Sequence, residues 1–385
     1  MKVLQRYFAV SILQAVAFVL VAFLALISFM DLTGELPDVG KDGYEIQHAF
    51  LYVLMLVPGH VYEVMPVAAL IGTIYTMAQF ANSSEFTIMR ASSMSTQMAA
   101  AMLFRIGVVL VLVTFVFGEL ITPRTAPWAE KLKLSAQGAS VSQQFKSGMW
   151  TKDVVRNDGV KGDITGSRFF NVSEFRPDGR LVDVKLYEFD NDFRMRSLIT
   201  AKTGVFEGDN KWRLEEVTET VFSNSAAAAA QTQGTFGQET STVTTRKLES
   251  MTLASEITPK ILSVSSADPE RMSANELAVY TRHLAENRQE TDRFKIAFWK
   301  KLIDPFAIFV LMALALPFAY LHTRSGGVSL KIFIGIMIGV SFILINTLFS
   351  HLGLLSTWPA FITAVAPSLL FLLLALGALW WVERH

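Results

Sequence analysis

The chain has 385 residues, of which 51% are hydrophobic and 18% charged, and its mean hydropathy is +0.38. Soluble domains contain about 25% charged residues, so this composition excludes a disordered chain. Lysine plus arginine and aspartate plus glutamate each number 34, which excludes a basic surface for nucleic acid. Because there is no cysteine, a disulfide scaffold, a thiolate nucleophile and a cysteine-ligated metal are also excluded.

The charges are concentrated in the middle of the chain. Between Arg124 and Lys300 lie 49 of the 68 charged side chains, so the two flanks are strongly apolar. Six flank segments supply the roughly 20 apolar residues that a helix needs to cross a bilayer. These segments are Tyr7–Met30, Val61–Phe80, Met98–Ile121, Phe298–Tyr320, Val328–Ser350 and Trp358–Val382. The sequence therefore predicts a membrane protein with one large polar insert.

An additional apolar stripe runs through residues 46–57. It predicts a separate helix lying at the membrane surface, which ends at Pro58 and Gly59 before the second span begins.

The charges in the short loops predict the orientation. The basic side chains at one end of the spans are Lys2, Arg6, Arg90, Arg324, Lys331 and Arg384. The first loop at the opposite end is acidic, and basic loops mark the cytoplasmic side. Both termini are therefore expected in the cytoplasm and the insert outside the membrane, which in a Gram-negative cell is the periplasm.

The insert alternates apolar and polar residues as β-strands do. One face is predicted to carry Val182, Val184, Leu186, Phe193, Met195 and Ile199. Turn signals at Asp178-Gly179 and Gly208-Asp209 separate such runs, which favours an all-β sandwich or jelly roll. Beyond Pro269, a capping box formed by Ser273 and Glu276 predicts a helix that leads into the fourth span.

These patterns define the expected fold class, a membrane α-helical protein with six transmembrane helices and an inserted periplasmic, jelly-roll-like all-β domain. Residues 1–123 are assigned to spans one to three with a short cytoplasmic helix near 83–92, residues 124–268 to the β domain, 269–297 to a linking helix and 298–385 to the last three spans.

No pattern of catalytic or metal-binding residues stands out. The six histidines are scattered, without the paired spacing of a zinc site, and no phosphate-binding loop is present, so no cofactor or metal is expected. The chain is expected not to be an enzyme. Two alternatives stay open at this point: a membrane-anchored periplasmic receptor or scaffold, and a lipid-modifying membrane enzyme.

The segment Pro66–Gly72, followed by Ser84–Ser92, resembles the LptF/LptG family of lipopolysaccharide-export permeases, and its LptG members more than its LptF members. The resemblance extends over the whole chain. It implies a β-jellyroll domain in an ABC transporter that takes lipopolysaccharide from the inner membrane. The implied partners are a second, LptF-type permease, a dimer of the cytoplasmic ATPase LptB, and periplasmic LptC and LptA.

Three groups of residues are candidates for these functions. For coupling to the ATPase, Ser83–Ser92 forms either a docking helix or an ordinary loop, and the resemblance favours docking through Glu85, Phe86, Met89 and Arg90. For lipid phosphates, or else for general headgroup anchoring, the outer cations are Arg124, Lys131, Lys133, Arg293, Lys295, Lys300 and Lys301. For the acyl chains, the candidate path is the apolar face of the β domain defined above.

Overall fold

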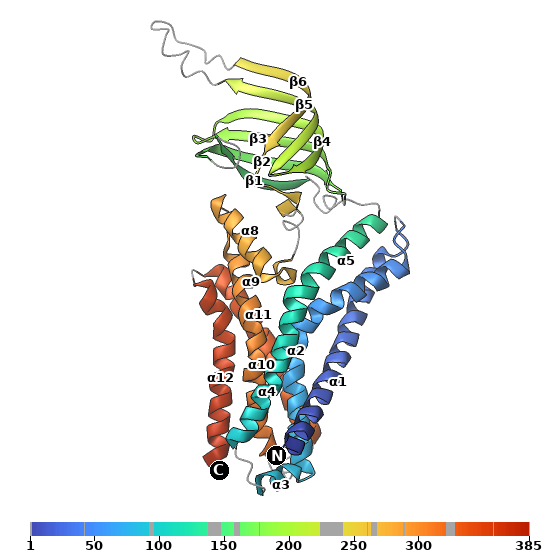
Figure 1. Cartoon of the computed structure of the whole chain (residues 1–385), viewed down its shortest axis with the longest axis vertical. Helices are drawn as coiled ribbons and strands as arrows, with labels where there is room; N and C mark the ends of the chain where they lie inside the picture. The colour runs from blue at the N-terminus through green and yellow to red at the C-terminus, as the bar shows by residue number, and fades with distance from the viewer. Residues whose placement is uncertain are drawn as a thin grey trace.

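The computed structural model describes residues 2–41, 43–91, 96–137, 148–157, 162–176, 178–223, 242–259, 261–262, 268–287, 289–320, 328–356 and 358–384. In Figure 1 a bundle of long helices carries a β domain at the end opposite both termini. Among the described residues, six helical segments are long and apolar enough to cross a membrane. The expected fold class, six transmembrane helices with an inserted all-β domain, is confirmed.

The first half of the bundle contains α1 (Lys2–Glu35), α2 (Ile46–Asn82), the short α3 (Glu85–Ala91) and α4 (Thr96–Phe115). A single 3-10 turn, η1 (Leu36–Asp38), follows α1. A π-helical turn, η2 (Val116–Ile121), joins α4 to α5 (Thr122–Ala136). At 1.5 Å per residue, the 37 residues of α2 span about 55 Å. The bilayer core is about 30 Å thick, so α2 extends well beyond it.

The helix predicted over residues 46–57 is not separate: it is the first part of α2, which continues through Pro58 and Gly59. Proline removes one backbone hydrogen bond from a helix, yet α2 continues through Pro58. A Cβ on Gly59 would lie 3.5 Å from Thr122 Cγ2, so α5 packs closely on α2 at this point. Helical structure also reaches past residue 123, and the first strand begins only at Met149.

The second half of the bundle begins with a 3-10 turn, η4 (Pro269–Arg271), and α8 (Ala274–Glu286). The fourth span consists of α9 (Asp292–Ile303), η5 (Asp304–Phe306), α10 (Ala307–Ala315) and η6 (Leu316–Ala319). The last two spans are α11 (Val328–Leu355) and α12 (Ala360–Arg384). The predicted capping box is present, because Ser273 and Glu276 exchange hydrogen bonds at the start of α8.

The β domain is one antiparallel sheet whose strands lie in chain order. They are β1 (Met149–Arg156), β2 (Ile164–Phe175), β3 (Leu181–Asp190), β4 (Met195–Gly208), β5 (Lys211–Ser223) and β6 (Thr242–Ala254). The turn between β4 and β5 consists of Asp209 and Asn210, both with positive φ. This conformation is typical of a tight hairpin.

The sheet bends along a line that crosses β2 to β5. On one side of the line, neighbouring strands contribute the buried residues Val172, Val184, Ala201 and Val217; on the other side they contribute Phe175, Leu181, Gly204 and Leu214. Two residues lie between these rows in each strand, where strict alternation would place one. Asp183 and Glu216 lie in this gap with φ of 50° and 52°, and this conformation turns the strand so that both rows point inward.

Candidate functional site

The helix α3 lies at the end of the bundle that carries both termini (Figure 1). Both carboxylate oxygens of Glu85 accept hydrogen bonds: Tyr7 Oη donates to Oε2 at 3.0 Å and Ser83 Oγ donates to Oε1 at 2.9 Å. Tyr7 belongs to α1, so the first span orients the first residue of α3. Glu85 stays partly accessible and has lone pairs left for a further donor.

The sequence placed Met89 in the docking surface of this helix, but the structure places its side chain against the bundle, one turn after Glu85. Met89 is only 6% exposed and packs in the core of the bundle with Phe8 and Phe80. The exposed apolar side chain is Ile88, at 63%. The reason is that α3 has only seven residues and needs an apolar anchor to stay on the bundle. Phe86 and Arg90 belong to α3, but their side chains lie outside the described residues.

The outer cations do not form one unpaired cluster. Lys133 Nζ lies 2.8 Å from Glu35 Oε2 and 3.5 Å from Asp38 Oδ2. The remaining pairs are Arg293 with Asp268, Lys295 with Asp292 and Lys300 with Glu270, each at 3.9 Å. These carboxylates come from the end of α1, from η1, from the segment before and within η4, and, for Lys295, from one turn earlier in α9 itself.

Lys301 is 3% exposed and therefore cannot reach a lipid headgroup. Its Nζ donates to the carbonyl of Glu270 at 3.0 Å and lies 4.4 Å from the centre of the Tyr62 ring. Of the seven outer cations, Arg124 and Lys131 are the two that are exposed and make no ion pair or hydrogen bond with any residue in the described part of the chain.

The interior of the bent sheet contains half of the residues predicted for it. Val184, Leu186 and Ile199 are at most 1% exposed. Val182 lies on the other face, because the positive φ of Asp183 interrupts the alternation and Leu181 takes the inner place. Phe193 is 75% exposed in the turn before β4, and Met195 is only partly buried at its start.

Trp212 is the largest fully buried side chain in the described chain, and the sequence reasoning did not select it. Its indole Nε1 donates to the carbonyl of Ile257 at 2.7 Å, which closes the interior with the segment after β6. The sequence does indicate that Trp212 is buried, because Trp212 and Leu214 alternate with charged residues along β5.

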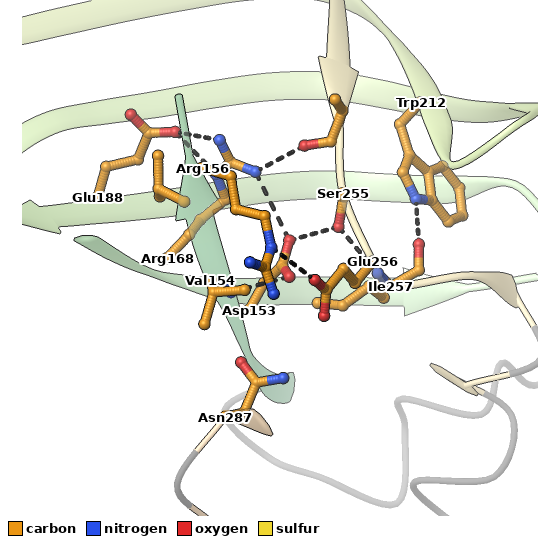
Figure 2. A network of polar contacts seen from close by, with 12 residues as sticks. Asp153, Val154, Arg156, Arg168, Glu188, Trp212, Ser255, Glu256, Ile257 and Asn287 are labelled. Atoms are coloured by element: carbon orange, nitrogen blue, oxygen red, sulfur yellow. Dashed lines mark hydrogen bonds and ion pairs between the residues drawn. The ribbon is translucent and has the colours of Figure 1, made fainter. Parts of the chain in front are cut away.

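A polar network lies at the base of the β domain (Figure 2). Asp153 is fully buried and accepts hydrogen bonds from Ser255 Oγ at 2.6 Å and from the Val154 amide at 2.9 Å. Arg168 Nη1 lies 3.6 Å from Asp153 Oδ2, and Arg168 Nη2 lies 2.6 Å from Glu188 Oε1. Burial raises the pKa of Asp153, although Ser255 and Arg168 oppose the shift. The network therefore links β1, β2 and β3 to the end of β6.

The helix α8 joins this network to the membrane bundle. At its end nearest the β domain, His283 Nδ1 lies 4.0 Å from Glu256, which also pairs with Arg156 at 3.0 Å. At its start, the Ala274 amide donates to Glu119 in the π-turn of the third span, at 3.0 Å. Burial lowers the pKa of His283, which favours the neutral ring. The helix is thus hydrogen-bonded to the third span at its start and lies close to Glu256 near its other end, and the sequence connected neither of these residues to it.

Comparison with known proteins identifies the family. The family model of the lipopolysaccharide export system permease LptF/LptG matches residues 6–383. The lipopolysaccharide export system permease protein LptG of Escherichia coli K12 is 27% identical over 381 residues, which cover 98% of each chain. The LptG protein of Haemophilus influenzae is also 27% identical, over 98% of this chain and 97% of its own. With its spans, its inserted sheet and this match over nearly all of its length, the chain belongs to the LptF/LptG family of lipopolysaccharide export permeases.

Proposed function

We propose that this chain is the transmembrane subunit of an ABC transporter that extracts lipopolysaccharide from the inner membrane and passes it to a periplasmic bridge for export to the outer membrane. The main support is the family match over residues 6–383, together with the apolar spans that flank an inserted β domain in this chain. In this proposal the termini and α3 face the cytoplasm and the β domain faces the periplasm. ATP hydrolysis takes place on a separate ATPase.

The proposed partners are an LptF-type permease, an LptB dimer, LptC and LptA. The exposed faces of the outer spans support a second membrane subunit. In the most apolar stretch of each span, only 11% of the residues of α1 and 22% of those of α11 are buried, against 61% in α2. The helix α3 is proposed to dock on the ATPase through the oriented carboxylate of Glu85 and the exposed side chain of Ile88.

The lipid is proposed to contact two parts of the periplasmic end. Arg124 and Lys131 are available for its phosphates, because they are exposed and unpaired within the described chain. The inner face of the bent sheet is available for its acyl chains, because it is lined by apolar side chains such as Leu186 and Ile199. Since this face is tightly packed, lipid entry requires the sheet to open.

A photo-crosslinker can test this path. Phe206 packs against the sheet interior, with its ring 5.1 Å from that of Trp212, whereas Phe193 is exposed in a turn. Benzoylphenylalanine at Phe206, in the complex with its ATPase and partner permease, should capture lipopolysaccharide only when ATP is present. The same group at Phe193 is the matched control. Equal capture from Phe193, or none from Phe206 in a complex that still hydrolyses ATP, contradicts the internal path.

A further inference from the structure

A cavity of about 340 Å³ lies between α1 and α4, near the end of the bundle that carries α3. It is lined by Gln5, Arg6, Ala9, Met102, Arg105 and Ile106. Tyr7, which follows Arg6, binds Glu85 of α3, so the cavity lies at the membrane boundary rather than at the bilayer centre. The cavity is partly open to its surroundings, and its volume is in the lower part of the range of pockets that bind small ligands.

The cavity has two arginines and no carboxylate. Arg6 and Arg105 are exposed, and neither makes an ion pair or hydrogen bond with any residue that the structure describes. A guanidinium at the edge of a hydrocarbon layer is costly unless a counter-charge or water satisfies its donors. Two such groups on neighbouring helices therefore suit one anion with several acceptor oxygens, such as a phosphate.

Apolar surface continues from the cavity toward the membrane centre. Its inner wall is made by Met102 and Ile106, which are 6% and 5% exposed. One and two helical turns beyond Arg105, on the same side of α4, lie Val109 and Val113, which are 49% and 36% exposed. On α1, Val10 occupies the corresponding place one turn after Arg6 and is 43% exposed.

We propose that this cavity binds an anionic glycerophospholipid. Its phosphate lies between Arg6 and Arg105, and one acyl chain follows the exposed valines of α4. A basic pocket between spans at the cytoplasmic boundary is suited to acidic headgroups. This proposal rests on the proposed function only for the orientation of the chain, which places the cavity in the cytoplasmic leaflet of the membrane. A free phosphate or a carboxylate from another subunit satisfies the arginines equally well, but neither makes use of the apolar surface beside them.

The test measures lipid retention by the purified full-length chain. The protein is incubated with mixed vesicles of phosphatidylglycerol and phosphatidylcholine in equal amounts, and the lipid that stays bound is identified by native mass spectrometry. The chain should retain phosphatidylglycerol preferentially. In the Arg6→Gln/Arg105→Gln variant this preference should fall by about fivefold for each arginine. The Arg105→Lys variant, which keeps the charge, should retain most of it.

The matched control is Arg194→Gln/Arg196→Gln, which removes two exposed arginines from the β domain and should leave lipid preference unchanged. Displacement of the lipid by glycerol 3-phosphate at equal concentration would show that the acyl chain contributes nothing, and would overturn the lipid assignment. Unchanged lipid preference in Arg6→Gln/Arg105→Gln, with loss of binding to the ATPase or second permease, would assign the cavity to a protein carboxylate instead. Neither lipopolysaccharide nor ATP is present, so failure here is separate from failure of the transport function.

Discussion

The Glu85 carboxylate is oriented before any partner binds. Tyr7 and Ser83 each donate to a different oxygen, so its side chain has little rotational freedom left to lose. An oriented charge binds with less entropic cost than a mobile one. The donors come from α1 and from the turn before α3, so the geometry of this carboxylate depends on how these elements pack together.

If α3 docks on an ATPase as proposed, reversal of the Glu85 charge should disconnect the two proteins. An interfacial charge that loses its partner costs about 2–5 kcal/mol when buried. We expect Glu85→Lys to abolish transport and co-purification with the ATPase, while its thermal melting in detergent stays near that of the original chain. A compensating charge reversal on the ATPase should partly restore both. Normal transport by Glu85→Lys would rule out the docking role.

The exposed cations Arg124 and Lys131, at the opposite end of the bundle, allow a second test. Because Lys301 is buried and Lys133 is paired, changes at these residues alter packing as well as charge. Arg124→Gln/Lys131→Gln changes charge alone. We expect this variant to weaken the stimulation of ATP hydrolysis by lipopolysaccharide severalfold, since exposed charges contribute about 0–1 kcal/mol each. Lys295→Gln, a paired cation on α9, serves as the comparison. Full stimulation in the double variant would mean that the phosphates bind elsewhere.

The stability of the contact between α8 and the β domain should depend on pH through His283. Its pKa is lowered by burial, so below about pH 6.5 the detached form binds more protons than the docked form. Docking is therefore complete above this pH and weakens as the pH falls toward the lowered pKa. The pKa of Asp153 is raised, so its protonation has the opposite effect.

Amide hydrogen exchange in α8 can measure this dependence. Protection in the original chain should stay constant above about pH 6.5 and decrease as the pH falls below it. In His283→Gln the decrease should disappear, because glutamine does not titrate. His351→Gln replaces an exposed histidine on α11 and should behave like the original chain. If His283→Gln keeps the full pH dependence, another group is responsible.

Contact between α1 and α2 depends on one glycine. A Cβ on Gly72 would lie 2.6 Å from the Val16 amide nitrogen and 2.7 Å from its Cα. These are backbone atoms, so the clash is relieved only if the two helices separate. We expect Gly72→Ala to lower stability by about 1–3 kcal/mol, as a shift in thermal melting. Gly377→Ala on α12 meets nothing within 4 Å and should not destabilise the chain. Equal melting of both variants would contradict the tight α1–α2 contact.

For the molecule as a whole, the sequence predicted the spans and the all-β insert correctly, because hydropathy and alternation report them directly. It missed the inner position of Leu181, because a positive φ at Asp183 changes the alternation without a glycine to mark it. It also missed the pairing of Lys133 with Glu35, which lie 98 residues apart. Local periodicity carries no information about which distant charges meet.

Burial is distributed unevenly among the spans. In the most apolar stretch of α2 and of the fourth span, 61% of the residues are buried, against 28% in α12 and 11% in α1. Two spans therefore form the core of the bundle, and the others surround it with one face open to lipid or to a neighbouring subunit. Changes in the open spans should act on assembly more than on folding, because they remove few contacts within this chain.

The attachment of α8 at both ends gives it the properties of a lever. Its start is hydrogen-bonded to Glu119 in the third span, and its far end lies against Glu256 below the sheet. Nine residues separate Ala274 from His283, which makes an arm of about 13.5 Å. A tilt of about 15° around Ala274 would move His283 by about 3.5 Å, which is close to the advance of one residue along a strand. A tilt of α8 that accompanied a rearrangement of the third span would therefore displace the base of the sheet far enough to exchange one side-chain contact for the next.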